Sequence, residues 1–193
     1  MCKATARGSA RILGGVLCGA IMGAALLASS APASAGSICF EAEKASLTGV
    51  FQKNCQNAGI SAAEMQEVRK AASGQNYIGV PEDGEKETEP AAGSATIKFN
   101  IGETGTYSVW VRAWWLDSCA NTFKMRIDDF DAFIMGGDNT YQTWHWVKFK
   151  TPFPLKPGEH VLYFSNNEDG AAADQLFLTT TKVVPQGAMK ASQ

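Results

Sequence analysis

The strongest constraint on the fold is a strict alternation of apolar and polar residues in three separate stretches, Ala95–Ile101, Tyr107–Ala113 and Phe123–Asp128. Successive side chains of a β-strand point to opposite faces, so this period predicts strands with one buried and one exposed face. We expect further strands at five stretches of similar composition: Ile38–Lys44, Val50–Lys53, Trp144–Lys150, His160–Ser165 and Gln175–Thr179.

Turn-forming sequences rich in Gly, Pro and Asn separate these stretches, as in Gly102–Gly105, Gly136–Asn139 and Asn166–Gly170. Many short strands at this spacing predict an all-β fold, a two-sheet β-sandwich of the jelly-roll type. One short helix is expected in a long loop at Ser61–Lys70. There Ser61 is followed three residues later by an acidic residue, the pattern of a capping box.

The first 35 residues differ in composition from the rest. They hold three basic residues and no acidic one, then the apolar run Ile12–Leu27, then Ala33-Ser34-Ala35. This order is typical of a secretory signal peptide, so we expect cleavage after Ala35. A transmembrane anchor is the alternative. It is disfavoured because the run is rich in Gly and shorter than the ~20 residues that a span needs.

The mature chain would then be residues 36–193, a secreted protein of the extracellular space or the periplasm. We expect the sandwich over 36–185 and a flexible tail over 186–193. Without the three basic residues of the signal, 14 Lys and Arg stand against 19 Asp and Glu, a net charge of −5. An acidic surface argues against nucleic acid and anionic membrane as partners. The acidic stretch 82–93 is expected to be an exposed loop.

Three cysteines remain in the mature chain: Cys39, Cys55 and Cys119. An exported protein can form disulfides, and the lack of a C-x-x-C pair argues against zinc, haem and thioredoxin-like chemistry. Ser46–Gly49 has the composition of a turn between two strands. A hairpin centred there would set Cys39 near Cys55, so we predict a disulfide between them, with Cys119 as the remaining thiol.

Nothing in the sequence predicts catalysis. There is no G-x-S-x-G and no H-E-x-x-H motif, and neither histidine lies in a recognisable nucleophile setting. No spacing of acidic residues predicts the pair of carboxyl groups that a glycosidase needs. The sequence therefore favours a protein that is not an enzyme.

The aromatic residues suggest binding instead. All five tryptophans lie between residues 110 and 146. In Tyr107–Trp114 the alternation places Trp110, Arg112 and Trp114 on the face opposite the predicted core, either exposed or packed under a loop. Exposed Trp and Tyr rings suit sugar binding because the C–H faces of a pyranose stack on them. A single Trp is nonetheless more often buried than exposed.

The chain resembles a known group in the order of several short motifs: Phe40-Glu-Ala-Glu43, Ala72–Ile78, Gly105–Ala113, Pro157–His160, Glu168–Gly170 and Asp174–Leu178. In this order the sequence resembles carbohydrate-binding modules of families 6 and 35, jelly rolls of the galactose-binding-like type. The resemblance covers nearly all of residues 38–185. It implies a β-sandwich, usually with a structural calcium, that binds oligo- or polysaccharide and catalyses nothing.

Acidic residues form the expected calcium site. Glu41 and Glu43 are two positions apart on a predicted strand, so both would point to one face, where a hard cation would offset their repulsion. The resemblance adds Asp174 of the last strand as a third ligand. Backbone carbonyl oxygens would complete the coordination shell of Ca²⁺.

For sugar contacts, the resemblance makes Tyr141 the stacking platform and places Trp144 in the core. Trp114 and Trp115, at a strand end, are expected to supply a second ring. Related modules often carry an Asn where this chain has Ala172. We therefore expect Asn167, with the neighbouring Asn166, Glu168 and Asp169, to take its place. The alternative is an extracellular structural or protein-interaction module that has lost sugar binding.

Overall fold

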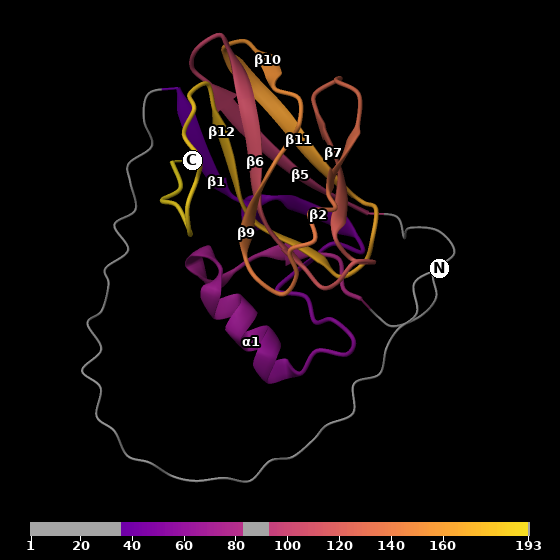
Figure 1. Cartoon of the computed structure of the whole chain (residues 1–193). Helices are drawn as coiled ribbons and strands as arrows, with labels where there is room; N and C mark the ends of the chain where they lie inside the picture. Colours follow the sequence, from indigo (N-terminus) through magenta and orange to yellow (C-terminus); the bar gives the residue numbers. More distant parts are fainter. Residues whose placement is uncertain (1–35, 83–92, 193) are drawn as a thin grey trace, which may run out of the picture.

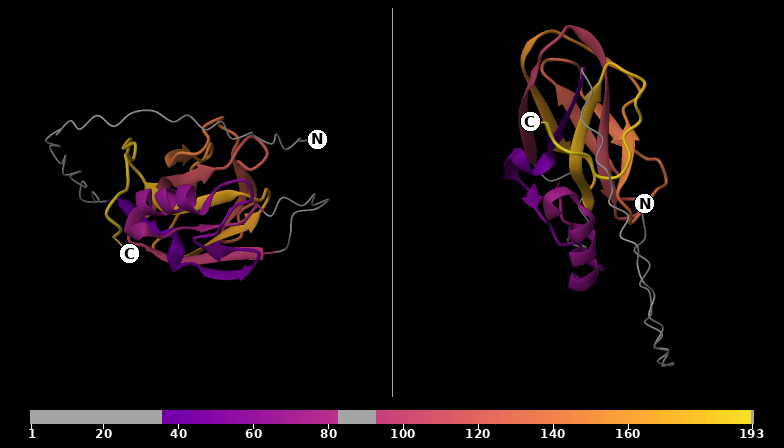
Figure 2. Two further views of the ribbon diagram at one scale, coloured as in Figure 1. Left: turned by 90° about the horizontal axis from the view of Figure 1, so that it is seen from below. Right: turned by 90° about the vertical axis from the view of Figure 1, so that its left-hand side faces the viewer.

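The computed structural model describes residues 36–82 and 93–192. The expected signal peptide and most of the predicted acidic loop lie outside these residues. The described chain forms two antiparallel sheets packed face to face, with one helix at one end and the C-terminus beside the first strand (Figures 1 and 2). The predicted all-β sandwich with one short helix is therefore confirmed. No helix of the described residues is long and apolar enough to cross a membrane.

The larger sheet has seven strands, with β12 at its centre. β12 pairs with β6 along one side and with β1 and β4 along the other. The remaining strands extend the sheet outward: β9 and β10 both pair with β6, and β3 pairs with β4. The bounds are β1 (Ser37–Glu41), β3 (Gln52–Lys53), β4 (Ile78–Gly79), β6 (Gly105–Trp115), β9 (His145–Lys148), β10 (Phe153–Leu155) and β12 (Ala171–Thr179).

The smaller sheet has five strands in the order β2-β5-β11-β7-β8. Its central strand, β11, pairs with β5 and β7 in antiparallel register. The bounds are β2 (Ser46–Gly49), β5 (Gly93–Ile101), β7 (Thr122–Ile127), β8 (Phe133–Gly136) and β11 (Gly158–Asn166).

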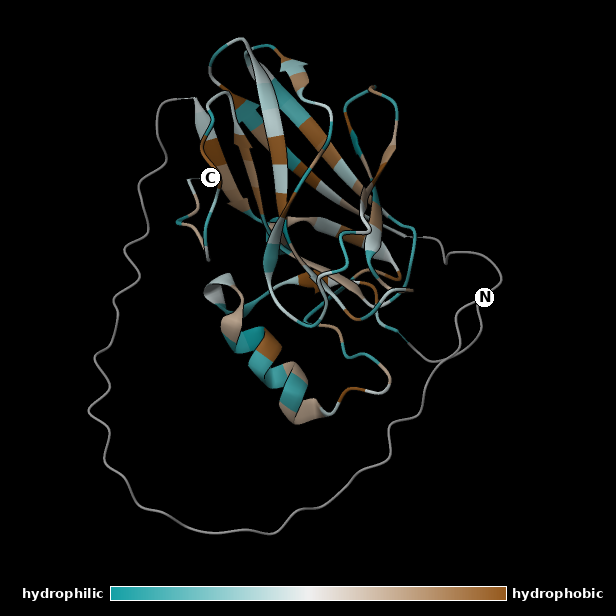
Figure 3. Ribbon diagram, viewed as in Figure 1, coloured by the Kyte–Doolittle hydropathy of each residue, from teal (hydrophilic) through white to brown (hydrophobic). Residues whose placement is uncertain are grey.

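The buried side chains of both sheets form one main core between the sheets. Hydrophobic and hydrophilic residues alternate along several strands, as the sequence predicted (Figure 3). On β6, Tyr107, Val109, Val111 and Ala113 are all buried in this core. The opposite face of β6 packs outside the sandwich. The alternation therefore identified the buried face of this strand correctly, because burial of one face fixes its register.

Helix α1 (Ala62–Ala71) begins at the predicted capping box. The Ser61 N–H donates to Glu64 Oε2 at 2.9 Å, and the Glu64 N–H donates to Ser61 Oγ at 3.2 Å. Met65 of the helix is buried in a second, smaller apolar cluster. This cluster, which we call the helix cluster, consists of Cys55, Met65, Ala72, Tyr77, Trp114, Leu116, Ala120 and Ala172.

The predicted disulfide between Cys39 and Cys55 is wrong, since both thiols are free and buried. The hairpin on which it depended does not form, because Ser46–Gly49 is itself strand β2 and pairs with β5 in the other sheet. The chain leaves β1 through the 3-10 turn η1 (Ala42–Lys44) and changes sheets. Cys39 therefore pairs across to Phe177 on β12, whereas Cys55 lies in the helix cluster.

The C-terminal segment, predicted to be a flexible tail over 186–193, makes several contacts with the sandwich through its described residues. Pro185 is buried, and the Trp146 Nε1–H donates to the Gly187 carbonyl oxygen at 2.8 Å. Further along, the Ser192 N–H donates to the Cys39 carbonyl oxygen at 2.8 Å. These contacts keep the end of the described chain beside β1 (Figure 1).

Candidate functional site

Three loops meet at the end of the sandwich where β6 ends and β12 begins; together, residues 116–121, 137–144 and 167–170 form what we call the loop rim. The Gln142 N–H donates to the Trp115 carbonyl oxygen at 2.8 Å, and the Gly137 N–H donates to the Asn121 carbonyl oxygen at 3.1 Å. The Asn121 N–H in turn donates to Glu168 Oε2 at 3.0 Å. The three loops are therefore fixed to one another by hydrogen bonds.

A tight backbone turn positions the longest of these loops. Gly136 has a φ of 123°, and a Cβ at this position would lie 1.9 Å from the Asn121 carbonyl oxygen. Only glycine fits so close to another backbone segment in this conformation. Asn139 and Gln142 also have positive φ, at 62° and 55°. The sequence Gly136–Asn139 thus sets the path that brings Tyr141 to the rim.

Tyr141 lies half-buried on the rim, with its ring packed against the edge of the main core. Its hydroxyl donates to Asn139 Oδ1 at 3.1 Å. The same loop carries Asp138, whose Oδ2 lies 2.8 Å from His145 Nε2. Asp138, Asn139 and His145 were missed by sequence reasoning, because Gly136–Asn139 was assigned only as a turn. The Asp-Asn pair in that turn was the available signal.

Trp114 and Trp115 do not form the expected second ring, because both are almost completely buried, at 2% and 0% exposure. β6 continues through Trp115, so the two residues belong to the strand and not to a loop. Trp114 faces the helix cluster, and Trp115 faces the main core, where its ring lies 5.6 Å from that of Phe123. Neither ring is available to a sugar.

Trp144, which the resemblance placed in the core, is only half-buried and packs against the helix cluster. Its Nε1–H donates to the Val68 carbonyl oxygen of α1 at 2.8 Å, and its ring meets Tyr77 edge-on at 5.5 Å. The Arg112 guanidinium lies over the same ring at 5.5 Å. Trp144 remains partly exposed, so it joins the helix to the sheet and does not lie in the main core.

Asn167 contributes to the rim through its amide. Its Nδ2 donates to Thr122 Oγ1 at 2.7 Å, and the same hydroxyl donates to Glu168 Oε2 at 2.8 Å. Ala172, at the position where related modules often carry Asn, is buried in the helix cluster. An apolar contact therefore replaces the expected polar group there.

Two of the predicted calcium ligands, Glu41 and Asp174, accept hydrogen bonds from Ser73 of the 3-10 turn η2 (Ser73–Gln75). Glu41 Oε1 accepts hydrogen bonds from Ser73 Oγ at 2.8 Å and from Gln175 Nε2 at 3.0 Å. Glu41 Oε2 and Glu43 Oε2 are buried and have no hydrogen-bond partner. Burial raises the pKa of Glu43, and the nearby Glu41 raises it further. Two buried carboxylate oxygens without donors are suited to a hard cation.

Asp174, the third predicted ligand, forms a buried ion pair with Arg112, and its Oδ1 accepts the Ser73 N–H at 3.0 Å. Burial raises the pKa of Asp174 to about 7, and the Arg112 guanidinium opposes this rise. Within the described residues no group of three or more His, Cys, Asp or Glu side chains could hold a metal ion. Glu43 lies in η1 and not on the strand, so the argument from strand alternation was wrong even though the two glutamates are close.

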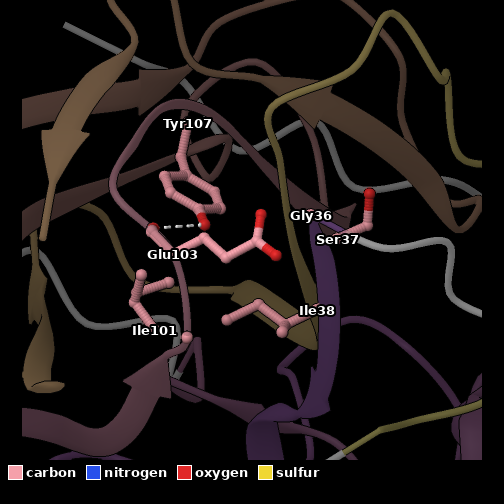
Figure 4. Close-up of a pocket in the computed structure, with 7 residues that line it drawn as sticks. Gly36, Ser37, Ile38, Ile101, Glu103 and Tyr107 are labelled. Carbon is pink, nitrogen blue, oxygen red and sulfur yellow. Dashed lines mark hydrogen bonds between the residues drawn. The ribbon is translucent and has the colours of Figure 1, made fainter. Parts of the chain in front are cut away.

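A separate hollow opens at the opposite end of the sandwich, where β6 begins (Figure 4). Its wall includes Ile38, Ile101 and Tyr107, and the Tyr107 hydroxyl donates to the Glu103 carbonyl oxygen at 3.0 Å. The Glu103 carboxylate is the single charged group among its lining residues. This hollow is remote from the loop rim along β6 and does not contribute to it.

Comparison with solved structures identifies the fold. A family 35 carbohydrate-binding module from Clostridium thermocellum superposes with a TM-score of 0.51 and 16% sequence identity, over 76% of this chain and 100% of that one. The chain has the fold of a family 35 carbohydrate-binding module. The fold predicted from the resemblance is therefore confirmed. No family model matches the sequence, and no curated protein matches it.

Longer proteins contain the same fold as one part. A Podospora anserina β-(1,4)-mannanase with a family 35 module matches with a TM-score of 0.53 and 17% identity, over 78% of this chain. An exo-β-1,3-galactanase from Phanerochaete chrysosporium matches with a TM-score of 0.51 and 17% identity, over 75% of this chain. This chain covers 29% of the length of each of these two enzymes.

Proposed function

We propose that this protein is a secreted, non-catalytic module that binds an oligo- or polysaccharide at the loop rim, with Tyr141 as the stacking ring. The observation that carries the proposal is the position of Tyr141. Its ring is half-exposed and lies on a loop that also carries Asp138 and Asn139, and His145 follows at the start of β9. A rigid ring beside amide, carboxylate and imidazole groups offers both a stacking surface and hydrogen bonds to sugar hydroxyls.

The other aromatic rings are less suited to this role. Trp114 and Trp115 are buried, and Trp144 is held by α1. Tyr163 points away from the core on β11, but the Arg126 guanidinium lies over its ring at 4.3 Å. Tyr141 is therefore the ring to test first.

The acidic groups of the rim support a binding role and not a catalytic one. Asp138 is paired with His145, and Glu168 accepts hydrogen bonds from Asn121 and Thr122. A glycosidase needs two carboxyl groups that flank an open cleft and act on the substrate. Carboxylates that already hold loops together are better explained as structural supports of the rim.

We also propose that Glu41 and Glu43 hold a structural Ca²⁺ ion, with backbone carbonyl oxygens as further ligands. Their two unpartnered buried oxygens support this assignment. Asp174 stays a predicted ligand, but its Oδ2 pairs with Arg112, so direct ligation through that oxygen requires Arg112 to turn away. A bound cation would add to the stability of the folded chain and would not take part in a reaction.

A glycan array, read with the mature protein in calcium and in chelator, tests the proposed function. We expect one class of glycan to bind, and Tyr141→Ala to weaken its binding by about 1–2 kcal/mol, typical of losing one rigid aromatic anchor. Tyr141→Phe is the matched control because it keeps the ring and removes only the hydroxyl that bonds Asn139. If no glycan binds the wild type at millimolar concentration, sugar binding is contradicted and the alternative of an extracellular protein-interaction module is favoured.

A further inference from the structure

His145, the first residue of β9, has a hydrogen-bond acceptor at each of its two ring nitrogens. Nε2 lies 2.8 Å from Asp138 Oδ2, and Nδ1 lies 3.0 Å from the Thr143 carbonyl oxygen. A carbonyl oxygen and an ionised carboxylate can only accept hydrogen bonds. A neutral imidazole has one N–H and can donate to only one of them, whereas the imidazolium ion donates to both. The observed geometry is therefore that of a protonated histidine.

Both acceptors belong to residues 137–144 of the loop rim, which we call the Tyr141 loop. Asp138 also fixes the turn before Tyr141, because its Oδ1 accepts the Thr140 N–H at 3.2 Å. The next residue, Asn139, accepts the hydrogen bond of the Tyr141 hydroxyl at 3.1 Å. One acceptor lies near the start of the loop and the other near its end, so the imidazolium ring ties the two ends of the loop together.

The Tyr141 loop needs such support because its backbone adopts an uncommon conformation. Asn139 and Gln142 have φ values of 62° and 55°, a region that residues other than glycine seldom occupy. Backbone of this kind persists only where the surrounding contacts hold it. A hydrogen bond from the Gln142 N–H to the Trp115 carbonyl oxygen holds one side of the loop, and His145 holds its ends. The loss of one contact of His145 should therefore loosen the loop.

Asp138 is the one charged partner of the His145 ring among the residues that the structure describes. On β6, which packs against the ring, Trp115 meets it edge-on at 6.0 Å. The cations of β6 and β9, Arg112 and Lys148, lie over tryptophan rings on the opposite face of the sheet. The other carboxylates of the rim each accept a hydrogen bond elsewhere: Asp117 from Cys119, Glu168 from Asn121, and Asp169 from Asn166.

We infer that His145 is a pH-dependent positioning residue for Tyr141: the protonated ring holds the Tyr141 loop in the observed conformation, and the neutral ring releases one of its two contacts. A histidine with an ordinary pKa changes charge between about pH 5 and pH 8. The affinity for sugar should accordingly fall as the pH rises through this range. That consequence rests on the proposed function, whereas the ordering of the loop does not.

Amide hydrogen exchange, followed by NMR without any sugar, tests the ordering of the loop. The Gln142 N–H reports on it, because its acceptor lies on β6. Its protection factor, which corrects for the intrinsic effect of pH on exchange, should fall about tenfold from pH 5.5 to pH 8, the effect of losing one hydrogen bond to a charged group. The fall should have the same midpoint as the titration of the His145 ring, measured by NMR on the same protein.

Asp138→Asn is the sharpest variant because it should reverse this pH dependence. The amide oxygen can still accept the Thr140 N–H. The amide nitrogen can donate to Nε2 of a neutral ring, whose Nδ1–H then donates to the Thr143 carbonyl oxygen. A neutral His145 therefore satisfies both contacts in this variant, and the protection of Gln142 should rise with pH. A histidine that served only for packing would show no such reversal.

His160→Gln is the matched control, because His160 is the other histidine of the chain and pairs with Asp128, away from the rim. It should keep the wild-type profile of the Tyr141 loop. His145→Gln, which is never charged, should give low protection of the loop at every pH. A flat profile in the wild type, or a profile that does not reverse in Asp138→Asn, would overturn the inference.

The same proteins are then titrated with a glycan at pH 5.5 and pH 8. In the wild type the dissociation constant should rise about as much as the protection falls, and in Asp138→Asn it should fall with pH. If the loop responds as expected but no glycan binds at either pH, the result supports the role of His145 and contradicts sugar binding. The two proposals can therefore fail separately.

Discussion

Arg112 and Asp174 form an ion pair that is buried on the outer face of the larger sheet, with side-chain exposures of 8% and 0%. A β-bulge interrupts the register of β12 between Ala173 and Gln175, and the residue in the bulge is Asp174. Arg112 also donates to the Ala71 carbonyl oxygen at the end of α1, at 3.2 Å. This pair therefore joins β6, β12 and the helix.

Arg112→Met should destabilise the protein by about 3–5 kcal/mol at neutral pH, the typical cost of leaving one partner of a buried pair unpaired. Urea unfolding measures the loss. Without Arg112 only the Ser73 N–H opposes the effect of burial on Asp174, so the pKa of Asp174 rises further above the unfolded value. Because a raised carboxyl pKa destabilises the fold as pH increases, the variant should regain stability as the pH falls from 7 to 5.

The double variant Arg112→Met with Asp174→Leu is the control for this prediction. It removes both charges, so it should recover much of the loss at pH 7. If Arg112→Met lowers the free energy of unfolding by the same amount at pH 7 and at pH 5, Asp174 carries no unpaired charge in the variant.

Trp115→Ala should destabilise the fold by about 3–5 kcal/mol, since it empties a large site in the main core. Trp115 is fully buried and contacts Phe123, whereas Tyr141 is half-exposed on the rim. Tyr141→Ala should therefore leave the melting temperature nearly unchanged. Thermal unfolding of the two variants checks both statements, and a small effect of Trp115→Ala would mean that the ring is not in the core.

How much of the fold could be predicted from the sequence depended on how far apart in the chain the interacting residues lie. The alternation identified the buried face of β6, and the capping box marked the start of α1, because both signals lie within one element. β2 was misread as a turn. Its partner, β5, is distant in sequence, so no local signal in Ser46–Gly49 could show that it crosses to the other sheet.

For the candidate site, too, the residues that are placed by distant contacts were the ones predicted wrongly. The resemblance identified Glu41 and Glu43, each of which has one buried oxygen without a partner, and Tyr141, which lies on the rim. Trp114 and Trp115 were misplaced because the extent of a strand beyond its clear alternation is set by its pairing, here with Ala171 and Ala172. The contacts of the C-terminal segment were missed because they are hydrogen bonds with distant residues such as Trp146 and Gln175, which leave no pattern in the sequence.

His160 should give the stability a defined pH dependence. Its Nδ1 lies 2.6 Å from Asp128 Oδ2, and its Nε2 lies 2.8 Å from the Lys156 carbonyl oxygen. Burial by itself lowers the pKa of His160, but these two acceptors outweigh it and raise the pKa above its ordinary value. The stabilisation is fully present below the unfolded pKa of about 6.5 and is lost as the pH rises through the folded value.

Asp128→Asn tests this contribution, because the amide can still accept the Val161 N–H that Asp128 Oδ1 accepts at 2.8 Å. We expect the variant to melt below the wild type at pH 5.5, and the difference to shrink as the pH rises to 8. Titration of the His160 ring by NMR gives the folded pKa directly. A melting difference that grows with pH would contradict the assignment.

Glu43→Gln should have opposite effects with and without calcium. In chelator the variant should be at least as stable as the wild type, since it removes the repulsion between Glu41 and Glu43, each of which has one buried oxygen without a donor. In excess calcium the wild type should gain about 2.7 kcal/mol at a hundredfold excess over the dissociation constant, and the variant should gain little. Urea unfolding under both conditions measures the four values. Glu67→Gln, on the exposed face of α1, is the matched control and should gain as much as the wild type. An equal gain in Glu43→Gln would place any bound calcium elsewhere.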